Sequence, residues 1–278
     1  MYTSLAQSRP VLLGSRYLPS HKENRMKNEG DVEYARKLFY GGVNPNLVFL
    51  LNHRFLWMQK FIDPEKSCGV EVGCGQGYGK DVLQAKSYLL TDYAEYEWLD
   101  VKHVDALNTP FEDNAFDFVV AANMIHHVPF PRIFFEEMQR ILKVGGRILV
   151  QDVNCSLLMR AMLHLMRIEG YSYDVDVFDR TTPVNDAKDL WSGNNAVPNM
   201  LFDDENRFHR EIPFFQIIDR GYGEVSVYLA SGGVTAKAFF IPLPRWLLQA
   251  LKWIDDGVVA LAPQIFALQR RIVLERIA

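Results

Sequence analysis

The sequence predicts an α/β fold in which a mostly parallel sheet carries helices on both faces. Between Ser67 and Val153, short apolar runs typical of buried strands alternate with helix-like segments, which is the pattern of a parallel sheet. A glycine-rich turn follows the first of these runs, and polar residues stand at the ends of the later ones. The length of 278 residues and a composition of 49% hydrophobic and 23% charged residues suit one globular domain with insertions.

The glycine-rich turn lies in residues 69–79, Gly-Val-Glu-Val-Gly-Cys-Gly-Gln-Gly-Tyr-Gly. We expect a strand to end at Val72 and a helix to begin near Lys80. Glycine at every second position lets the chain turn sharply and brings bare backbone N–H groups close to a ligand. Glu71 lies two residues before Gly73, where the alternating glycines begin, and its carboxylate would repel a pyrophosphate but suit a cationic amino group. The turn therefore favours S-adenosylmethionine (SAM) over NAD as the cofactor.

Four segments further along the chain extend the pattern in a fixed order: 88–92 (Tyr-Leu-Leu-Thr-Asp), 104–111 (Val-Asp-Ala-Leu-Asn-Thr-Pro-Phe), 116–128 and 140–150. With them, residues 67–152 resemble the class I SAM-dependent methyltransferases of the type 11 methyltransferase domain family. The resemblance implies a Rossmann-like, seven-stranded mixed sheet whose last strand is antiparallel. One departure is that only twelve residues separate Asp92 from Asp105, so we expect the second crossover helix to be lost or reduced to a turn.

The resemblance also implies a SAM site, with S-adenosylhomocysteine as product and no metal. The implied cofactor residues are Glu71 near the methionine ammonium, Gly73, Gly75 and Gly77 in the loop, Asp92 on the ribose, Tyr93 on the adenine face, Asp105 and Ala106 at the adenine edge, and Asn123 beside the sulfonium. Most of them stand at or just after the ends of expected strands. Because ligands of such sheets bind at the carboxyl ends of the strands, these residues are expected to share one site.

Two histidines, His126 and His127, follow the fourth expected strand. One interpretation is structural, with both rings satisfied by the backbone. The other makes His127 a general base for an acceptor hydroxyl, because histidine has a pKa suited to that task at neutral pH. Direct in-line displacement from a sulfonium can also proceed by positioning alone, without a dedicated base.

We expect the residues that contact the methyl acceptor to lie C-terminal to Asp152. Residues 191–202 combine an aromatic ring with amides, which makes Trp191, Asn194 and Asn195 candidate substrate contacts, although an exposed loop would have the same composition. This segment and Ser231–Gly233 resemble a bacterial subgroup of the family. The methionine-rich segment 155–168 would line an apolar acceptor pocket or pack in the core. The acidic segment 171–189 lacks the pattern of a calcium loop and is interpreted as a solvated insertion.

We expect three parts in the chain: an N-terminal arm and helices over 1–62, the SAM-binding core over 63–155, and insertions with the last two strands over 156–278. The arm, residues 1–31, is either solvated or a lid over the cofactor. Asn44 and Pro45 are typical of a helix start. Residues 215–219 and 271–276 are the expected last strands, and two amphipathic helices are expected over 239–268. These helices would cap the site, form a homodimer interface or lie on a membrane surface.

Charge and cysteine content restrict the function further. Thirty basic against 34 acidic residues give a net charge of −4, which excludes the strong basic footprint of a nucleic-acid-binding protein. Three cysteines without metal spacing, and no signal-peptide pattern, favour the cytoplasm, with a membrane-peripheral location as the alternative. We therefore expect methyl transfer from SAM to a small-molecule or lipid-like acceptor, chiefly at oxygen. The alternatives are a SAM-binding scaffold without turnover and an NAD-dependent oxidoreductase.

Overall fold

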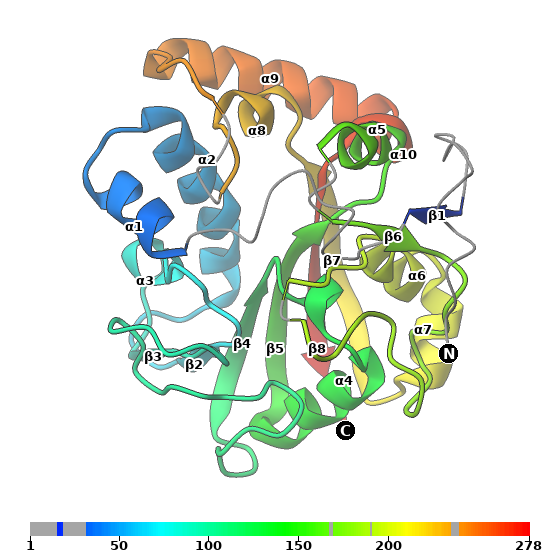
Figure 1. Ribbon diagram of the computed structural model, residues 1–278. Coiled ribbons are helices and arrows are strands. Elements are labelled where there is room, and N and C mark those ends of the chain that lie inside the picture. The colour runs from blue at the N-terminus through cyan, green and yellow to red at the C-terminus, as the bar shows by residue number, and fades with distance from the viewer. Residues whose placement is uncertain (1–15, 19–31, 167–168, 190, 235–238) are drawn as a thin grey trace.

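A six-stranded mixed sheet forms the centre of the part of the chain that the computed structural model describes, residues 16–18, 32–166, 169–189, 191–234 and 239–278 (Figure 1). The strand order is β3-β2-β4-β5-β8-β7. Strands β3, β2, β4 and β5 are parallel to their neighbours, and β8 is antiparallel to both β5 and β7. The strands are β2 (Cys68–Glu71), β3 (Ser87–Leu90), β4 (Phe116–Ala122), β5 (Leu142–Val153), β7 (Phe215–Gly223) and β8 (Gln269–Arg276). Two short strands, β1 (Tyr17–Leu18) and β6 (Tyr171–Ser172), pair outside this sheet.

The predicted fold class is confirmed, with six strands in this sheet where seven were expected. The place of a further edge strand beside β3 holds only an isolated parallel bridge between Thr91 and Val101. Residues 92–115, which are all described, contain turns and no helix. The short stretch between Asp92 and Asp105 explains both differences, because it cannot hold a crossover helix and a full strand. The antiparallel last strand is present as β8.

The helices cover both faces of the sheet, as Figure 1 shows. They are α1 (Val32–Tyr40), α2 (Pro45–Leu56), α3 (Gly79–Val82), α4 (Pro131–Ile141), α5 (Leu157–Met166), α6 (Val197–Phe202), α7 (Glu205–Glu211), α8 (Ser226–Ala230), α9 (Arg245–Leu261) and α10 (Pro263–Phe266), with 3-10 turns η2 (Trp57–Phe61) and η3 (Ile125–His127).

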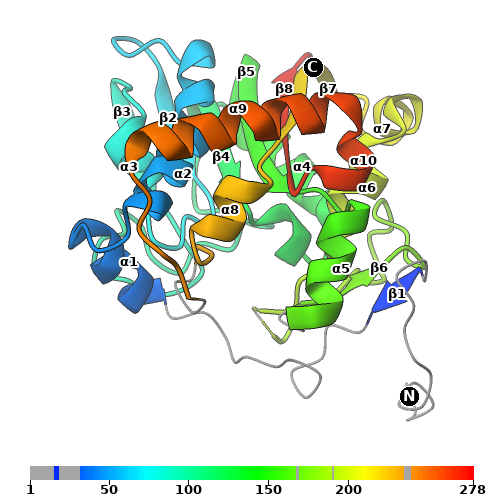
Figure 2. The ribbon, with the colours of Figure 1, turned by 90° about the horizontal axis from the view of Figure 1, so that it is seen from above.

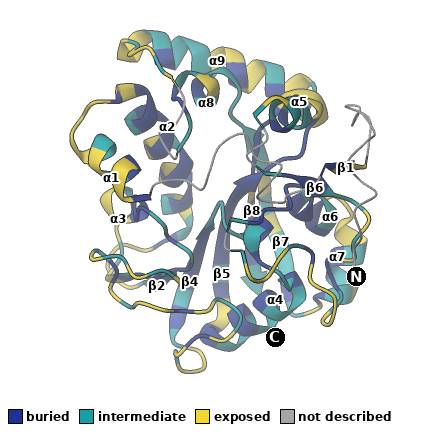
Figure 3. Ribbon diagram, in the orientation of Figure 1, coloured by how far each residue is buried: buried dark blue, intermediate teal, exposed yellow. Residues whose placement is uncertain are grey.

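Alternation along the strands divides the core in two. Val119 of β4 faces a cluster that contains α4 residues such as Phe134, whereas the next residue, Val120, faces a cluster that contains Leu50 of α2. Successive side chains of a strand point to opposite faces, so a run of apolar residues fills both layers. Figure 3 shows the middle of β4 and the C-terminal half of β5 as continuously buried, whereas most of β7 is only partly buried.

Helix α2 begins as predicted. Asn44 is its N-cap and accepts a hydrogen bond from the N–H of Leu47, and Pro45 occupies the first turn. The amide of Asn44 also donates to the carbonyl of Ser231, at 2.8 Å. Asn46 donates to the carbonyls of Ala230 and Ile241. These buried amides tie α2 to the C-terminal region that the chain reaches almost 200 residues later.

Helices α9 and α10 occupy the segment in which two amphipathic helices were expected. In Figure 2, α9 runs across the molecule beside α8. Its outward face exposes large apolar residues, among them Trp246 (72% exposed), Trp253 (69%) and Leu261 (87%). Among the described helices, none is long and apolar enough to span a bilayer.

Two sequence expectations concern the segments beside the core. The acidic segment 171–189 exposes Asp174 and Asp176 but buries Val177, Phe178 and Val184 in the core, so it is only partly a solvated insertion. The lid role considered for residues 1–31 falls, apart from 16–18, outside the described residues.

Candidate active site

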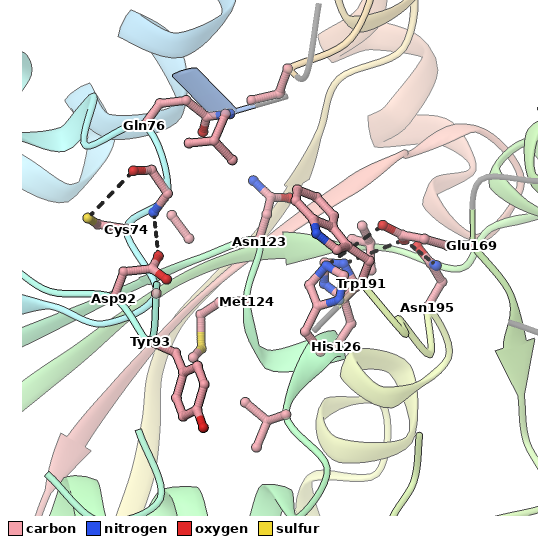
Figure 4. Close-up of a pocket in the computed structure, with 18 of the residues that line it drawn as sticks. Cys74, Gln76, Asp92, Tyr93, Asn123, Met124, His126, Glu169, Trp191 and Asn195 are labelled. Carbon is pink, nitrogen blue, oxygen red and sulfur yellow. Dashed lines mark hydrogen bonds and ion pairs between the residues drawn. The ribbon is translucent and has the colours of Figure 1, made fainter. Parts of the chain in front are cut away.

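A cleft of about 640 Å³ opens at the carboxyl ends of β2, β4 and β5. The glycine loop and the turn after β3 line one side. The loop after β4 lines the other, together with Asp186, Ala187, Asp189, Trp191 and Asn195. Figure 4 shows Asn123 between these sides, with Asp92 and Tyr93 in one direction and His126, Trp191 and Glu169 in the other. The chain therefore brings strand ends and a distant insertion to one cavity.

The glycine loop adopts backbone angles that only glycine accommodates easily. Gly73, Gly75 and Gly77 have φ values of 62°, 49° and 70°. At Gly75 a Cβ would meet no atom within 4 Å, so the backbone of this residue faces open space at the cleft. Gly77 instead packs beside Leu90 and Trp98 and is not among the lining residues.

Glu71 is a buried carboxyl at the cleft, with 1% of the residue exposed. Its Oε2 accepts a hydrogen bond of 2.6 Å from the hydroxyl of Tyr88. Burial raises the pKa of Glu71 to about 8, even though the hydrogen bond from Tyr88 opposes that rise. No Lys, Arg or His in the described part of the chain forms an ion pair with it. A cleft wall with an uncompensated buried carboxyl fits a cationic ligand group.

The turn after β3 presents the other expected cofactor residues. Asp92 accepts the backbone N–H of Gly75 at 2.8 Å with Oδ2 and that of Ala94 at 2.9 Å with Oδ1. Each carboxylate oxygen can accept a further hydrogen bond, so Asp92 remains able to bind a diol. Tyr93 is 57% exposed, and Asp105 and Ala106 line the same wall. These residues lie together, as expected from their places at the strand ends.

Asn123 marks the boundary between the two sides of the cleft. It has a φ of 53°, in the left-handed region that asparagine tolerates better than most residues, and its N–H donates to the carbonyl of Gln151 at 2.6 Å. This geometry directs the chain from β4 into η3, which carries both histidines.

A histidine–carboxylate cluster, defined as His126, His127, Asp152 and Glu169, forms the far side. His126 Nδ1 lies 2.5 Å from Asp152 Oδ1, and His126 Nε2 lies 3.6 Å from Glu169 Oε2. His127 Nε2 lies 3.7 Å from Glu169 Oε1, and His127 Nδ1 is buried without a hydrogen-bond partner among the described residues. Figure 4 shows Glu169 directed toward the histidine side of the cleft.

The two histidines differ in their electrostatic surroundings. Burial by itself would lower the pKa of His126, but the adjacent Asp152 and Glu169 outweigh it, and the pKa is raised above 6.5. Burial, together with the neighbouring His126, lowers the pKa of His127 to about 4. Burial would raise the pKa of Glu169, but the two histidines hold it below its usual value. At neutral pH, His127 is therefore a neutral imidazole beside an ionised Glu169.

The three substrate-side candidates fall into different environments. Trp191 and Asn195 line the cleft, and Asn195 donates to Glu169 Oε2 at 2.8 Å. Asn194 does not line it, because its side chain is used in hydrogen bonds to the backbone. Its Oδ1 accepts from the N–H of Ser172, and its Nδ2 donates to the carbonyls of Ser172 and Val184. Asn194 thus holds the insertion in place.

Sequence reasoning missed Asp152 and Glu169 as site residues. Asp152 is the residue before the last in β5, so the strand-end rule that selected Asp92 could have selected it as well. Glu169 lies in the insertion between α5 and β6, and no local pattern marks it. Among the described residues, His126, His127 and Glu169 form a group of metal-ligating side chains whose ligand atoms lie close together.

Comparisons with known proteins identify the family of the central part of the chain. Residues 70–150 match the sequence model of a family described as "Methyltransferase domain". This part of the chain is a class I SAM-dependent methyltransferase domain. A "Probable S-adenosylmethionine-dependent methyltransferase" from Mycolicibacterium smegmatis is 32% identical over 96 residues, 31% of this chain and 37% of that protein. A "Demethylmenaquinone methyltransferase" from Staphylococcus haemolyticus is 47% identical over 52 residues, 19% of this chain and 22% of that protein.

The fold of the methyltransferase domain and its surroundings is also similar to a solved structure. The crystal structure of a SAM-dependent methyltransferase from Archaeoglobus fulgidus gives a TM-score of 0.51 at 14% identity, and covers 88% of this chain and all of that one. The likeness extends to the fold alone at this identity. The chain spans well under half the length of the curated relatives above.

The residues present fit SAM as the family's cofactor. The buried carboxyl of Glu71, which has no ion-pair partner among the described residues, suits the ammonium. The open backbone at Gly75 suits the methionine part, and the exposed ring of Tyr93 suits an adenine face.

Proposed function

We propose that the protein transfers the methyl group of SAM to an oxygen atom of a small-molecule or lipid-like acceptor. The observation that carries the proposal is the arrangement around Asn123, which separates the expected cofactor residues from the histidine–carboxylate cluster within one cleft. A donor bound on the first side and an acceptor bound on the second would meet near Asn123. In-line positioning of this kind supplies much of the acceleration of a displacement reaction.

The cofactor side acts through binding and orientation. SAM, when bound, supplies an electrophilic methyl group on a sulfonium. Glu71 would neutralise the ammonium, Asp92 would accept hydrogen bonds from the ribose hydroxyls, and Tyr93 with Asp105 and Ala106 would hold the adenine. The backbone of Gly73 and Gly75 would lie along the methionine carbon chain. These roles account for why the loop needs glycine at both positions.

An apolar wall on the acceptor side favours an acceptor with apolar surface. Met159, Met162, Leu163 and Met166 of α5 line the cleft beside Trp191. Methionine adapts its shape to an irregular apolar ligand. The match of 52 residues to a demethylmenaquinone methyltransferase is consistent with a small-molecule acceptor.

Transfer to a neutral hydroxyl releases a proton, and the histidine–carboxylate cluster is placed to take it. His127 is our candidate base from the sequence, and its neutral ring can accept a proton at pH 7. Its pKa of about 4 makes it a weak base on its own. We therefore assign the proton to the cluster as a whole. His127 and Glu169 would accept it on the cleft side, while Asp152 orients His126 through its Nδ1.

The exposed apolar face of α9 also bears on where the protein would act in the cell. Trp246 and Trp253 with Leu261 give an amphipathic helix of the kind that lies at a membrane surface, with Arg245 and Lys252 beside them. A peripheral position on a cytoplasmic membrane would bring a lipid-like acceptor to the cleft. A homodimer is the other arrangement that would cover this face.

The test is transfer of labelled methyl from SAM into an extract of the source cells, followed by partition between organic solvent and water. We expect label in the organic phase, above a boiled control. Label confined to the aqueous phase would contradict an apolar acceptor. No label, with SAM binding intact, would contradict catalysis and leave a SAM-binding scaffold.

A further inference from the structure

The group His126, His127 and Glu169 has the composition and spacing of a metal site. Its ligand atoms all lie within 4.8 Å of one another. The separations of 3.6 Å and 3.7 Å between the histidine Nε2 atoms and Glu169 are too long for N–H···O hydrogen bonds. Two donors that share a tetrahedral zinc ion, each about 2.1 Å from it, lie about 3.4 Å apart. The first separation ends on Oε2 of Glu169 and the second on Oε1, and each is closer to the spacing of two ligands on one ion than to a hydrogen bond. One oxygen of Glu169 would bind the ion, since one ligand atom from each of the three residues lies within 4.8 Å of the other two.

Asp152 fixes which nitrogen of His126 faces Glu169. The Asp152 carboxylate is fully buried and accepts the backbone N–H groups of Ile125, at 2.9 Å, and Val153, at 2.7 Å. It acts as an acceptor toward His126 Nδ1 as well, so this nitrogen donates and Nε2 of the neutral ring carries the lone pair. Metal-bound histidines commonly donate their second ring N–H to a carboxylate in this way.

The remaining contacts hold Glu169 and the second ring against this lone pair. Asn195 donates to Glu169 Oε2 at 2.8 Å. Gly193 leaves room for the approach, because a Cβ there would lie 3.0 Å from Glu169 Oε2 and 3.1 Å from His126 Cδ2. The consecutive rings of His126 and His127 turn toward the same carboxylate, with centroids 4.1 Å apart. Several acceptor atoms therefore face one point, an arrangement that a cation at that point stabilises.

We propose that His126, His127 and Glu169 bind one divalent transition metal ion of the zinc type, with a coordination position open to the cleft. Three protein ligands and one open position are the pattern of catalytic zinc sites, whereas structural sites are closed by four. Two imidazoles and a carboxylate suit zinc, iron(II) or cobalt(II) more than magnesium or calcium, which take oxygen ligands. This site departs from the metal-free chemistry that the sequence predicted.

The role of the ion rests on the proposed function. Its open position would take the acceptor hydroxyl and lower the pKa of that group. Because both histidines would then be ligands of the ion, His127 would no longer act as a base. The hydroxyl proton would pass to the non-coordinating oxygen of Glu169 and from there to solvent. An oxygen electron pair then forms the new C–O bond, while the S–CH₃ bond breaks and its electron pair stays on sulfur. The products are the methyl ether, S-adenosylhomocysteine and one proton.

The experiment uses the full chain after removal of metal with a chelator. Zinc is titrated by calorimetry, and cobalt(II) is titrated by visible absorption, which reports coordination geometry. We expect one equivalent of each to bind, and cobalt to give the intense bands of a four- or five-coordinate site. His127→Ala and Glu169→Gln should each weaken zinc binding by about 100-fold or more, and Asp152→Asn by about 10- to 100-fold. His103→Ala, which removes an exposed histidine paired with Glu95, should leave binding unchanged.

Two results would overturn the proposal. One is the absence of saturable zinc binding by the wild-type chain. The other is equal zinc affinity in the wild type and in both ligand variants, provided that circular dichroism shows the variants folded. SAM binding is measured separately on the metal-free chain, so a protein that binds zinc but not SAM would contradict the proposed function and leave the metal site standing.

Discussion

His126 Nδ1 and Asp152 Oδ1 lie 2.5 Å apart and connect the loop after β4 to the end of β5. Both residues are almost fully buried, with 3% and 0% of their side chains exposed. The contact fixes the ring of His126 from behind, so that its other nitrogen faces the cleft. Asp152 does not need to touch a substrate to control the reaction, and we regard it as a positioning residue.

Asp152→Asn tests this relationship. The amide keeps the size of the side chain but can present its NH₂ to His126 and reverse the protonation of the ring. We expect kcat to fall by about 100-fold or more, while the Kd for SAM changes by less than about threefold. Asp174→Asn, at an exposed pair with Arg16, is the matched control and should leave both values unchanged. An unaltered kcat in Asp152→Asn would refute the positioning role.

Glu71 should couple SAM binding to proton release. Its pKa is about 8 in the folded protein against 4.5 for the free side chain, so between these values the folded state binds more protons than the unfolded one. The contribution of Glu71 to the free energy of unfolding therefore falls as pH rises through this window. A bound ammonium lowers the pKa of Glu71, so SAM binding near pH 7 should release close to one proton.

The released proton is measured by calorimetry in buffers that differ in ionisation enthalpy. Glu71→Gln should bind SAM more weakly and abolish the buffer dependence. Equal proton release in the variant and the wild type would assign the proton to another group.

Gly75→Ala tests the open backbone of the glycine loop. Gly75 and Gly145 both have positive φ, 49° and 79°, and a Cβ at either meets no atom within 4 Å. Both alanine variants should therefore lose about 1–2 kcal/mol of stability from backbone strain. Only Gly75 lines the cleft, so only Gly75→Ala should also weaken SAM binding, by about tenfold or more. The same loss of SAM affinity in Gly145→Ala would show that strain, and not contact, is responsible.

Removing one partner of the buried ion pair of Arg54 and Glu224 should destabilise the fold strongly. Two contacts of 2.6 and 2.7 Å join side chains that are 3% and 13% exposed. Glu224→Gln leaves the Arg54 charge buried without its partner and should cost about 3–5 kcal/mol in the free energy of unfolding. Glu275→Gln, at the more exposed pair with Arg147, should cost about 0–1 kcal/mol. Denaturant unfolding measures both, and equal costs would contradict the burial argument.

The cleft wall that carries Glu71, Gly75 and Asp92 could be predicted from the sequence because local patterns determine it. A strand end, a glycine loop and an acid two residues before it are all read within a few positions, and Glu71, Gly75 and Asp92 lie where the pattern puts them. The N-cap at Asn44 was predictable for the same reason. The structural role of Asn194 was harder to predict, because the hydrogen bonds of its side chain to the backbone of Ser172 depend on how the insertion folds.

The acceptor side could not be predicted, because it depends on contacts between distant segments. Glu169 meets His126 across 43 positions of sequence, and Gly193 matters only because both side chains crowd it. The sequence also could not show how His126 and His127 differ. The contact of His126 with Asp152 distinguishes them, and it joins two strand ends that are far apart in the sequence.

The central claim is that the cleft at the ends of β2 and β4 binds SAM, and an equilibrium titration of the purified chain with SAM tests it most directly. We expect saturable binding of SAM and S-adenosylhomocysteine with one site per chain and no binding of NADH. Asp92→Ala should weaken SAM binding by at least about 1–3 kcal/mol, through the lost ribose hydrogen bonds. Absence of SAM binding, or unchanged affinity in Asp92→Ala, would contradict the account.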